Sequence, residues 1–236
     1  MNFISLKKVD LNNKYLEKEN NELKVYRGYS HCYTIFNSKV KLSDALDWKD
    51  ISQENETCVI PISCLIINKG KCVGYVTSLT YGVDGVKIIE NLPDLADRKA
   101  IAQNLVDLYE KLLNNNSAYT NWCLEDLLVE NSQKIRLINP HFLIDVIMHE
   151  QFDTPLLDYN FCVLVLSVLY GLDFSIINAE EIPDLNIPEG IKEILNNRKN
   201  EKITIDTIKA IIRYTKNEFV YQPQIQKLKR EILTNN

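Results

Sequence analysis

The spacing of hydrophobic residues along this chain changes from a strand-like to a helix-like period near residue 90. Before that point, short runs rich in Val, Ile and Tyr are separated by turn signals such as RGYS (27–30) and NKGK (68–71). After it, DLADRKAIAQNLVDLYEKLLNNN (94–116) places apolar residues three and four positions apart, as on one face of a helix. Strands followed by helices predict an α+β fold.

The same change of period suggests two parts. We expect a β-rich part over residues 1–82 and a larger helical part over 83–236, which meet near 79–85. In the first part, SDALDWKDISQENE (43–56) is predicted to form a short helix, with Ser43 as its N-cap. The second part is predicted to contain a hairpin over 119–142 and helices over 156–171, 188–197, 204–215 and 222–234.

Composition narrows the class of partner and the compartment. The 236 residues carry a net charge of −5, which gives no basic footprint for nucleic acid or anionic lipid. The longest apolar run, FCVLVLSVLYGL (161–172), is shorter than the ~18 residues of a membrane span and is expected to be a buried helix. The first residues, MNFISLKKVDLNNK, lack the apolar core of a signal peptide. We therefore expect a cytoplasmic protein without a membrane span or a nucleic-acid partner.

Cysteine and histidine spacing indicates no metal site. The six cysteines, at positions 32, 58, 64, 72, 123 and 162, form no C-x-x-C pair and are expected to be reduced thiols in the core. The three histidines, at positions 31, 141 and 149, match no zinc spacing and are interpreted as scattered polar residues. NET (55–57) and NNS (115–117) match the glycosylation sequon, which without secretion is a chance match.

The most specific stretch of the sequence is YTNWCLEDLLVENSQKIRLINPH (119–141). Its order of polar loop, apolar strand, turn and second apolar strand resembles the protein-kinase-like fold. Members of that family carry H-x-D-L-x-x-x-N-I-L-V, then a strand ending in D-F-G. The resemblance covers residues 23–214 and implies a two-lobed fold, with a small antiparallel β-rich N-lobe and a larger helical C-lobe. The spacing and the apolar pattern match the family, whereas the polar residues differ.

On this resemblance, Asn121 stands at the position of the catalytic-base aspartate and Asp126 at that of a metal-binding asparagine. Asn139 stands at the position of the metal-binding aspartate, and Pro140 and His141 follow in place of Phe and Gly. An amide cannot serve as a general base, and its neutral oxygen is a weaker ligand than a carboxylate for a hard cation. Ordinary kinase catalysis is therefore expected to be lost, while Asp126 remains a candidate metal ligand.

The resemblance also assigns a nucleotide site. PISCLIINKGKCVGYVTSLTYG (61–82) is similar to the fourth and fifth strands and the hinge, so Leu79 and Tyr81 are expected beside an adenine. Gly28 stands where the phosphate-covering loop usually has two or three glycines.

The strand lysine that pairs with phosphates is expected to be Lys41, with Lys39 as the alternative. Its acidic partner would be Glu54 or Glu56. Together, Gly28, Lys41 and the hinge allow ATP with Mg²⁺ to bind as a cofactor without requiring it.

The start of LLDYNFCVLVLSVLYGLDF (156–174) is similar to the buried helix of the large lobe. The resemblance makes Asp158 a structural anchor that holds the catalytic loop through backbone hydrogen bonds. About 18 residues separate Asn139 from Asp158, fewer than an activation segment with an A-P-E anchor needs, and DTP (153–155) is the nearest remnant. Peptide-substrate binding of the usual kind is therefore not expected.

Three functions are consistent with these features. The first is a pseudokinase, a catalytically impaired kinase-like protein that acts as a protein-binding or regulatory module. Its partner would dock in the groove between the lobes or on the segment 222–234. The second is an atypical kinase or small-molecule phosphotransferase that uses Lys41, Asp126 and Glu125 with ATP and Mg²⁺. The third is a structural α+β domain without a nucleotide site.

Overall fold

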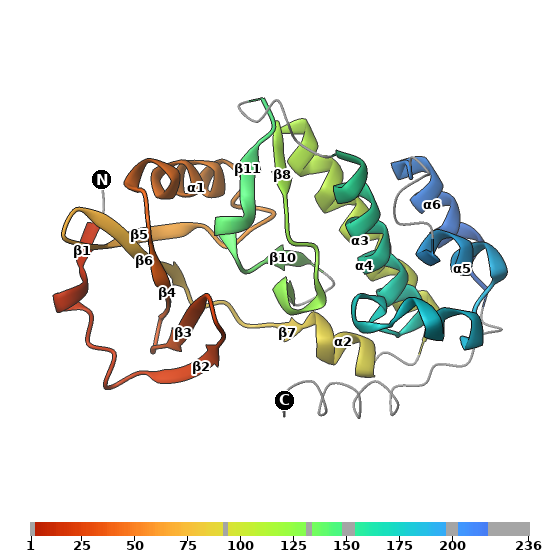
Figure 1. Ribbon diagram of the computed structural model, residues 1–236, viewed down its shortest axis with the longest axis horizontal. Coiled ribbons are helices and arrows are strands. Elements are labelled where there is room, and N and C mark those ends of the chain that lie inside the picture. The colour runs from red at the N-terminus through yellow and green to blue at the C-terminus, as the bar shows by residue number, and fades with distance from the viewer. Residues whose placement is uncertain (1–2, 92–93, 131–133, 148–153, 197–202, 217–236) are drawn as a thin grey trace. The chain divides into compact units, whose positions relative to one another are not determined.

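The computed structural model describes residues 3–91, 94–130, 134–147, 154–196 and 203–216. Within these ranges the protein is an α+β structure with one six-stranded sheet, two smaller sheets and six α-helices (Figure 1). This confirms the α+β class expected from the sequence.

The chain forms two compact units, and segments of the two units alternate along the sequence. The first unit comprises residues 1–81, 111–120 and 136–150, and the second comprises 82–110, 121–135 and 151–236. The division at residue 82 that we expected from the sequence stays a prediction.

The six-stranded sheet forms most of the first unit. Its strand order is β1-β5-β6-β4-β3-β2, and all neighbouring strands are antiparallel except the parallel pair of β1 and β5. The strands are β1 (Phe3–Ser5), β2 (Tyr15–Glu19), β3 (Leu23–Arg27), β4 (His31–Val40), β5 (Ile62–Asn68) and β6 (Lys71–Ser78).

The turn between β5 and β6 follows directly from the sequence. Lys69 and Gly70 both have positive φ angles, 50° and 76°, and Asn68 pairs with Lys71 across the turn. Two-residue turns with positive φ at both positions match the right-handed twist of antiparallel strands. The turn signal NKGK is therefore confirmed as a tight hairpin.

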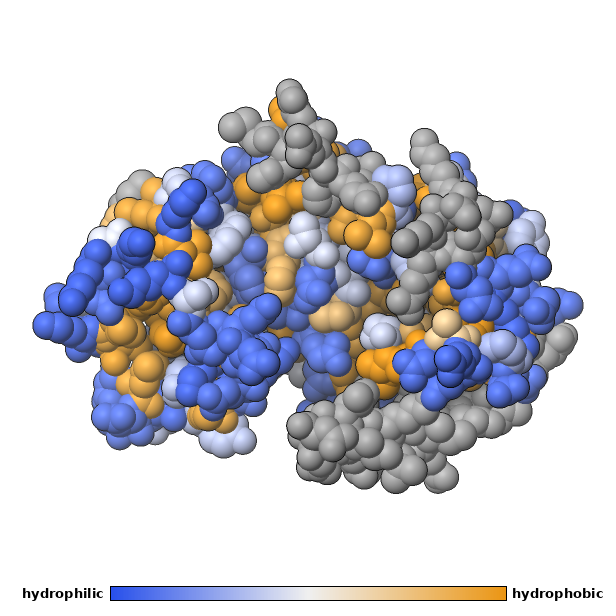
Figure 2. Space-filling model, viewed as in Figure 1, coloured by the Kyte–Doolittle hydropathy of each residue, from blue (hydrophilic) through white to orange (hydrophobic). Residues whose placement is uncertain are grey.

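Helix α1 (Leu42–Glu54) packs on the sheet and closes one core of the first unit. This core comprises Ala45, Ile62, Leu65, Cys72 and Tyr75, with Phe36, Leu46 and Trp48 packed around them. A second core of Ile66, Val73 and Val76 is covered by Ile4, Leu6 and Val9 from β1 and the 3₁₀ turn η1 (Leu6–Lys8). Figure 2 shows hydrophobic patches between hydrophilic residues on the visible face of the molecule.

The start of α1 differs from the prediction. The helix begins at Leu42, and Lys41 is its N-cap, although the Lys41 side chain makes no capping hydrogen bond. The Ser43 hydroxyl lies inside the first turn and donates to the Asp44 carboxylate at 2.9 Å. The prediction of Ser43 as N-cap was therefore wrong by two residues, because Leu42 packs against the core and starts the helix earlier.

The hairpin expected over 119–142 is more elaborate in the structure. Strand β9 (Leu127–Val129) neighbours β10 (Ile135–Leu137) and also β7 (Val83–Asp84). Strand β8 (Ser117–Tyr119) instead pairs with β11 (Leu143–Asp145), which follows the 3₁₀ turn η4 (Pro140–Phe142).

The second unit is mainly helical. Its helices are α2 (Gly85–Asn91), α3 (Leu95–Asn114, whose last turn belongs to the first unit), α4 (Thr154–Tyr170), α5 (Glu189–Asn196) and α6 (Ile205–Tyr214). Helices α3 to α6 confirm the predicted helices to within about two residues at each described end. Helix α2 was not predicted, and the predicted helix 222–234 lies outside the described residues. Among the helices in the described ranges, none combines the length and the apolar character that crossing a membrane requires.

A buried polar network joins α1 to the segment before β8 within the first unit. Asn55 is fully buried, and its side-chain amide donates to the Ile51 carbonyl and to the Ser117 hydroxyl, both at 3.0 Å. Its side-chain oxygen accepts from the Asn115 amide at 3.0 Å. The asparagines of the two sequon matches, NET and NNS, are therefore hydrogen-bonded to each other.

We expect Asn55→Ala to lower the free energy of unfolding by about 2–3 kcal/mol, because it leaves buried polar partners unsatisfied. Asn91→Ala is the matched control, since Asn91 is exposed and its side chain bonds only one carbonyl, that of Lys87. Urea denaturation of both variants measures the difference. Equal losses for the two variants would show that the Asn55 network contributes nothing specific.

Candidate functional site

The candidate catalytic loop belongs to the second unit, where the structure brings Asn121 and Asp126 together. The Asn121 amide nitrogen donates to Asp126 Oδ2 at 2.8 Å and contacts Cys123 Sγ at 3.4 Å. The loop closes with the 3₁₀ turn η2 (Leu124–Asp126), in which the Asp126 backbone N–H donates to the Cys123 carbonyl at 3.3 Å. Asp126 is only 1% exposed, whereas Asn121 is half-buried, so the hydrogen bond between them is partly buried.

The pair has little capacity for proton transfer. The Asn121 nitrogen is a donor, and the carboxylate that faces it already accepts that hydrogen bond. Glu125, the candidate replacement base, is exposed. In the parts of the chain that the structure describes, no three His, Cys, Asp or Glu side chains gather as metal ligands. Asp126 as a metal ligand therefore stays a prediction.

A cluster of three aromatic rings holds this loop in the second unit. The Trp122 ring lies 5.6 Å from the Tyr109 ring on α3 and 4.8 Å from the Phe161 ring on α4. The Tyr109 and Phe161 rings stack with their centroids 4.3 Å apart. Because Trp122 directly follows Asn121, this packing determines where the amide of Asn121 lies.

Asp158, the predicted anchor, lies on α4 next to this aromatic cluster. It accepts a hydrogen bond from the Tyr109 hydroxyl. Burial raises the pKa of Tyr109, and the hydrogen bond and the negative charge of Asp158 raise it further. The tyrosine therefore stays protonated and acts as a donor. Backbone hydrogen bonds from Asp158 to the loop stay a prediction. Sequence reasoning treated Tyr109 only as a core position of α3 and overlooked Trp122.

The structure brings three predicted nucleotide residues to one end of the six-stranded sheet. Gly28 lies in the turn between β3 and β4, where its N–H donates to the His31 carbonyl at 2.9 Å. Leu79 follows β6, and its N–H donates to the Ser30 carbonyl at 2.9 Å. The exposed Tyr81 ring lies 6.0 Å from the Arg27 guanidinium.

Lys41 lies at the other end of β4 from this group. Ten residues of strand separate the Gly28 turn from Lys41, roughly 30 Å at about 3.3 Å per residue. Lys41 and the alternative Lys39 are both exposed. Glu54 and Glu56 are also exposed, and neither forms an ion pair with Lys41 in the described structure. The structure thus does not bring the proposed lysine and acid together.

Asn139 belongs to the first unit, where it precedes η4. Its carbonyl accepts a hydrogen bond from the Phe142 N–H at 3.2 Å, which closes the 3₁₀ turn. The side chain makes no capping hydrogen bond to this turn.

His141 on η4 is packed among aromatic rings, so its interpretation as a scattered polar residue was wrong. Its Nδ1 lies 2.8 Å from the Tyr75 hydroxyl, and the rings of Phe36, Trp48 and Phe142 lie 5.6, 6.0 and 4.1 Å away. Burial and, to a smaller extent, the positive charge of Lys18 together lower the pKa of His141 to about 4. The partners come from β4, α1 and β6, which the sequence pattern could not relate to residue 141.

The six cysteines are free thiols, as expected, and Cys58, Cys72 and Cys162 are buried. Burial raises the pKa of Cys162 to about 12, so it is inert as a nucleophile.

A scan against protein-family models finds no match for this chain, and a search of curated proteins finds none either.

We expect Asn121→Asp to destabilise the protein by about 2–3 kcal/mol at neutral pH, because it places two carboxylates at hydrogen-bond distance in a buried loop. The double variant Asn121→Asp/Asp126→Asn restores one amide and one carboxylate and should recover most of that loss. Chemical denaturation of both variants measures the effect. If Asn121→Asp alone is as stable as the wild type, this result contradicts the hydrogen bond between Asn121 and Asp126.

The lowered pKa of His141 predicts a pH dependence of stability. The folded-state pKa of about 4 lies below the ordinary 6.5, so between these values the unfolded chain binds a proton that the folded chain does not. The contribution of His141 is complete above pH 6.5 and is lost as the pH falls toward 4, by at most roughly 3 kcal/mol at ~1.36 kcal/mol per pKa unit.

His141→Phe keeps an aromatic ring and removes the titrating group. Urea denaturation across this pH range should show a shallower loss of stability in the variant than in the wild type. Parallel profiles would mean that the packing of His141 does not depend on its neutral state.

Proposed function

We propose that this chain is a pseudokinase: a catalytically impaired, kinase-like protein that acts in the cytoplasm as a protein-binding or regulatory module. The observation that carries the proposal is the partly buried hydrogen bond from Asn121 to Asp126. The residue at the catalytic-base position is an amide, and its nitrogen is bonded to the acid of the same loop.

The order of elements in the first unit supports the kinase-like part of the proposal. Five antiparallel strands, β2 to β6, follow one another in the chain, and a single helix, α1, is inserted between β4 and β5. The hairpin of β5 and β6 leads to Leu79, which is the order that the resemblance implies for the fourth and fifth strands and the hinge. On this correspondence β4 is the third strand, on which kinases carry the phosphate-binding lysine. Lys41 lies one residue beyond it.

The chemistry of the loop supports impairment. Removing a general base slows a reaction by ~10²–10⁴, and kinases turn over at ~1–100 s⁻¹, so base loss alone leaves a slow enzyme. Phosphoryl transfer also needs carboxylates that hold the metal ions, and Asn139 offers a neutral amide at that position.

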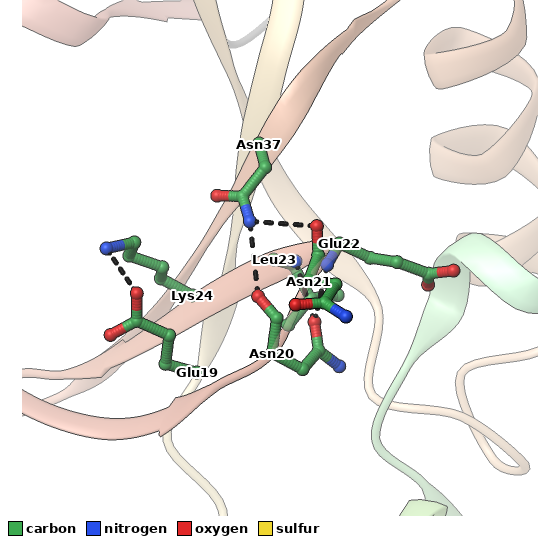
Figure 3. Close-up of polar contacts among 7 residues, drawn as sticks. All are labelled: Glu19, Asn20, Asn21, Glu22, Leu23, Lys24 and Asn37. Carbon is green, nitrogen blue, oxygen red and sulfur yellow. Dashed lines mark hydrogen bonds and ion pairs between the residues drawn. The ribbon is translucent and has the colours of Figure 1, made fainter.

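With β2, β3 and β4 as the first three strands, the phosphate-covering loop of a kinase corresponds to the turn between β2 and β3 and not to the turn that holds Gly28. The turn between β2 and β3 offers few backbone donors to a phosphate. In the turn between β2 and β3, Asn20 Oδ1 accepts from the N–H groups of Glu22 and Leu23, both at 2.8 Å (Figure 3). The Asn37 amide donates to the Asn20 and Asn21 carbonyls at 3.1 and 3.0 Å. Because phosphate loops bind through free backbone N–H groups, a turn whose N–H groups bond its own side chain fits a protein with weak or absent nucleotide binding.

We expect millimolar ATP with Mg²⁺ or Mn²⁺ to leave the unfolding temperature unchanged and to transfer no labelled γ-phosphate to the chain or to casein. A ligand that binds the folded state at a hundredfold excess over Kd would stabilise it by about 2.7 kcal/mol, so binding is easy to detect.

The variant Asp126→Asn tests the alternative transferase. It removes the only carboxylate at a ligand position of the loop while an amide can still bond Asn121, and Glu193→Gln on the exposed side of α5 is the control. A metal-dependent shift in the wild type that only Asp126→Asn abolishes would replace the pseudokinase by a phosphotransferase.

A further inference from the structure

One end of the six-stranded sheet carries an unusual number of exposed aromatic residues. Four tyrosines are exposed in the described ranges, and three of them, Tyr15, Tyr29 and Tyr81, belong to this end of the first unit. Tyr29 is fully exposed, and Tyr15 and Tyr81 are 72% and 74% exposed. Single exposed apolar residues are ordinary, whereas a group of them marks an interaction surface.

The pairing of the strands brings these residues together. Tyr15 at the start of β2 lies opposite Arg27 at the end of β3, and Arg27 lies opposite Cys32 on β4. Tyr29 is in the turn that joins β3 to β4. In the same turn, the Ser30 carbonyl accepts a hydrogen bond from the N–H of Leu79, which lies two residues before Tyr81 in the chain. We call Tyr15, Arg27, Tyr29 and Tyr81 the sheet-end patch.

Two cations lie at this end, and both are positioned by rings. The Arg27 guanidinium lies 6.0 Å from the Tyr81 ring, and Lys14 Nζ lies 4.5 Å from the Tyr33 ring. Rings below a cation hold its position while its outer side remains able to bind an anion. Tyrosine and arginine are also the residue types that carry most binding energy at protein interfaces.

The only ion pair of Arg27 in the described structure is weak enough to exchange. Its guanidinium lies 3.1 Å from Glu17 Oε1, and both side chains are 39% exposed. Exposed pairs of this kind contribute about 0–1 kcal/mol, so a carboxylate of a partner can replace Glu17 at little cost. A partner that supplies the acid in a desolvated contact would gain a charge-assisted, bidentate hydrogen bond.

We propose that the sheet-end patch docks an acidic segment of a partner protein. Arg27 and the nearby Lys14 select carboxylates, and the exposed rings select apolar side chains next to them. A nucleic acid is disfavoured, because its continuous row of phosphates needs more cations than these two side chains supply. This inference rests on the proposed protein-binding role and names the chemistry of the partner.

The test uses fluorescence anisotropy of the full chain with three short labelled peptides of equal apolar content. One carries several Asp and Glu residues, one carries Asn and Gln in their place, and one carries Lys. The acidic peptide is expected to bind best, with an affinity that falls between about 50 and 300 mM NaCl as the charges are screened. Arg27→Gln and Tyr81→Ala should each weaken it by about tenfold.

The matched control is the second exposed arginine–tyrosine pair, on α6. The Arg213 guanidinium lies 5.5 Å from the ring of Tyr214, which is 70% exposed, and this pair belongs to the second unit. Arg213→Gln and Tyr214→Ala should leave peptide binding unchanged. The four substituted side chains are exposed or partly exposed, so the variants should keep the wild-type unfolding temperature.

Equal binding of the neutral peptide, equal loss in the α6 variants, or no binding of the acidic peptide would each overturn the docking surface. Stronger binding of a single-stranded oligonucleotide that displaces the peptide would assign the patch to nucleic acid instead. Peptide binding together with γ-phosphate transfer would leave the patch standing and remove the pseudokinase. No peptide binding together with no γ-phosphate transfer would remove the docking surface and leave the pseudokinase standing.

Discussion

The packing of α1 on the six-stranded sheet determines how the first unit is assembled from distant segments of the chain. Trp48 of α1 and Phe36 of β4 form the aromatic surface that receives His141, so η4 is held against the sheet. At the C-terminal end of α1, the buried Asn55 holds the start of β8 through Ser117. The helix contacts both segments, which also pair with each other through β8 and β11. A change that displaces α1 therefore disturbs regions some sixty and ninety positions further along the chain, such as Ser117 and His141.

The hydrogen bond between Asn121 and Asp126 shows how a loop can keep its shape while its chemistry changes. A carboxylate accepts and an amide donates, so the same bond forms whichever of the two positions holds the acid. Only an acid at position 121 would place a proton acceptor where a kinase has its catalytic base. The aromatic anchor at Trp122 is independent of which position holds the acid, since it packs on α3 and α4. The forces that stabilise this loop thus make no demand for the catalytic acid, and its loss need not cost stability.

Whether a feature of the fold or the site could be predicted from the sequence depended on how far apart its interacting residues lie along the chain. The helices other than α2 and the β5–β6 turn were predicted because their signals, a period of 3.6 and a Lys-Gly pair, lie within a few neighbouring residues. Asn121 and Asp126 are five positions apart, and the resemblance to a kinase loop motif marked them as a pair. His141 was misinterpreted because its partners lie at positions 36, 48 and 75, and no periodic pattern relates them to it. The hydrogen bond between Tyr109 and Asp158 spans 49 positions and was overlooked for the same reason.

The turn between β2 and β3 fits the proposed absence of nucleotide binding. A loop that covers phosphates needs backbone N–H groups that are free until the ligand arrives, which glycine permits. Here Asn20 bonds two of those groups and Asn37 bonds the carbonyls of the same turn, so a phosphate would have to break existing hydrogen bonds to form its own. That exchange brings little net gain. A ligand of the first unit therefore gains more from side chains that give up no hydrogen bond when they bind it. The exposed rings of Tyr29 and Tyr81 beside Arg27 are such groups.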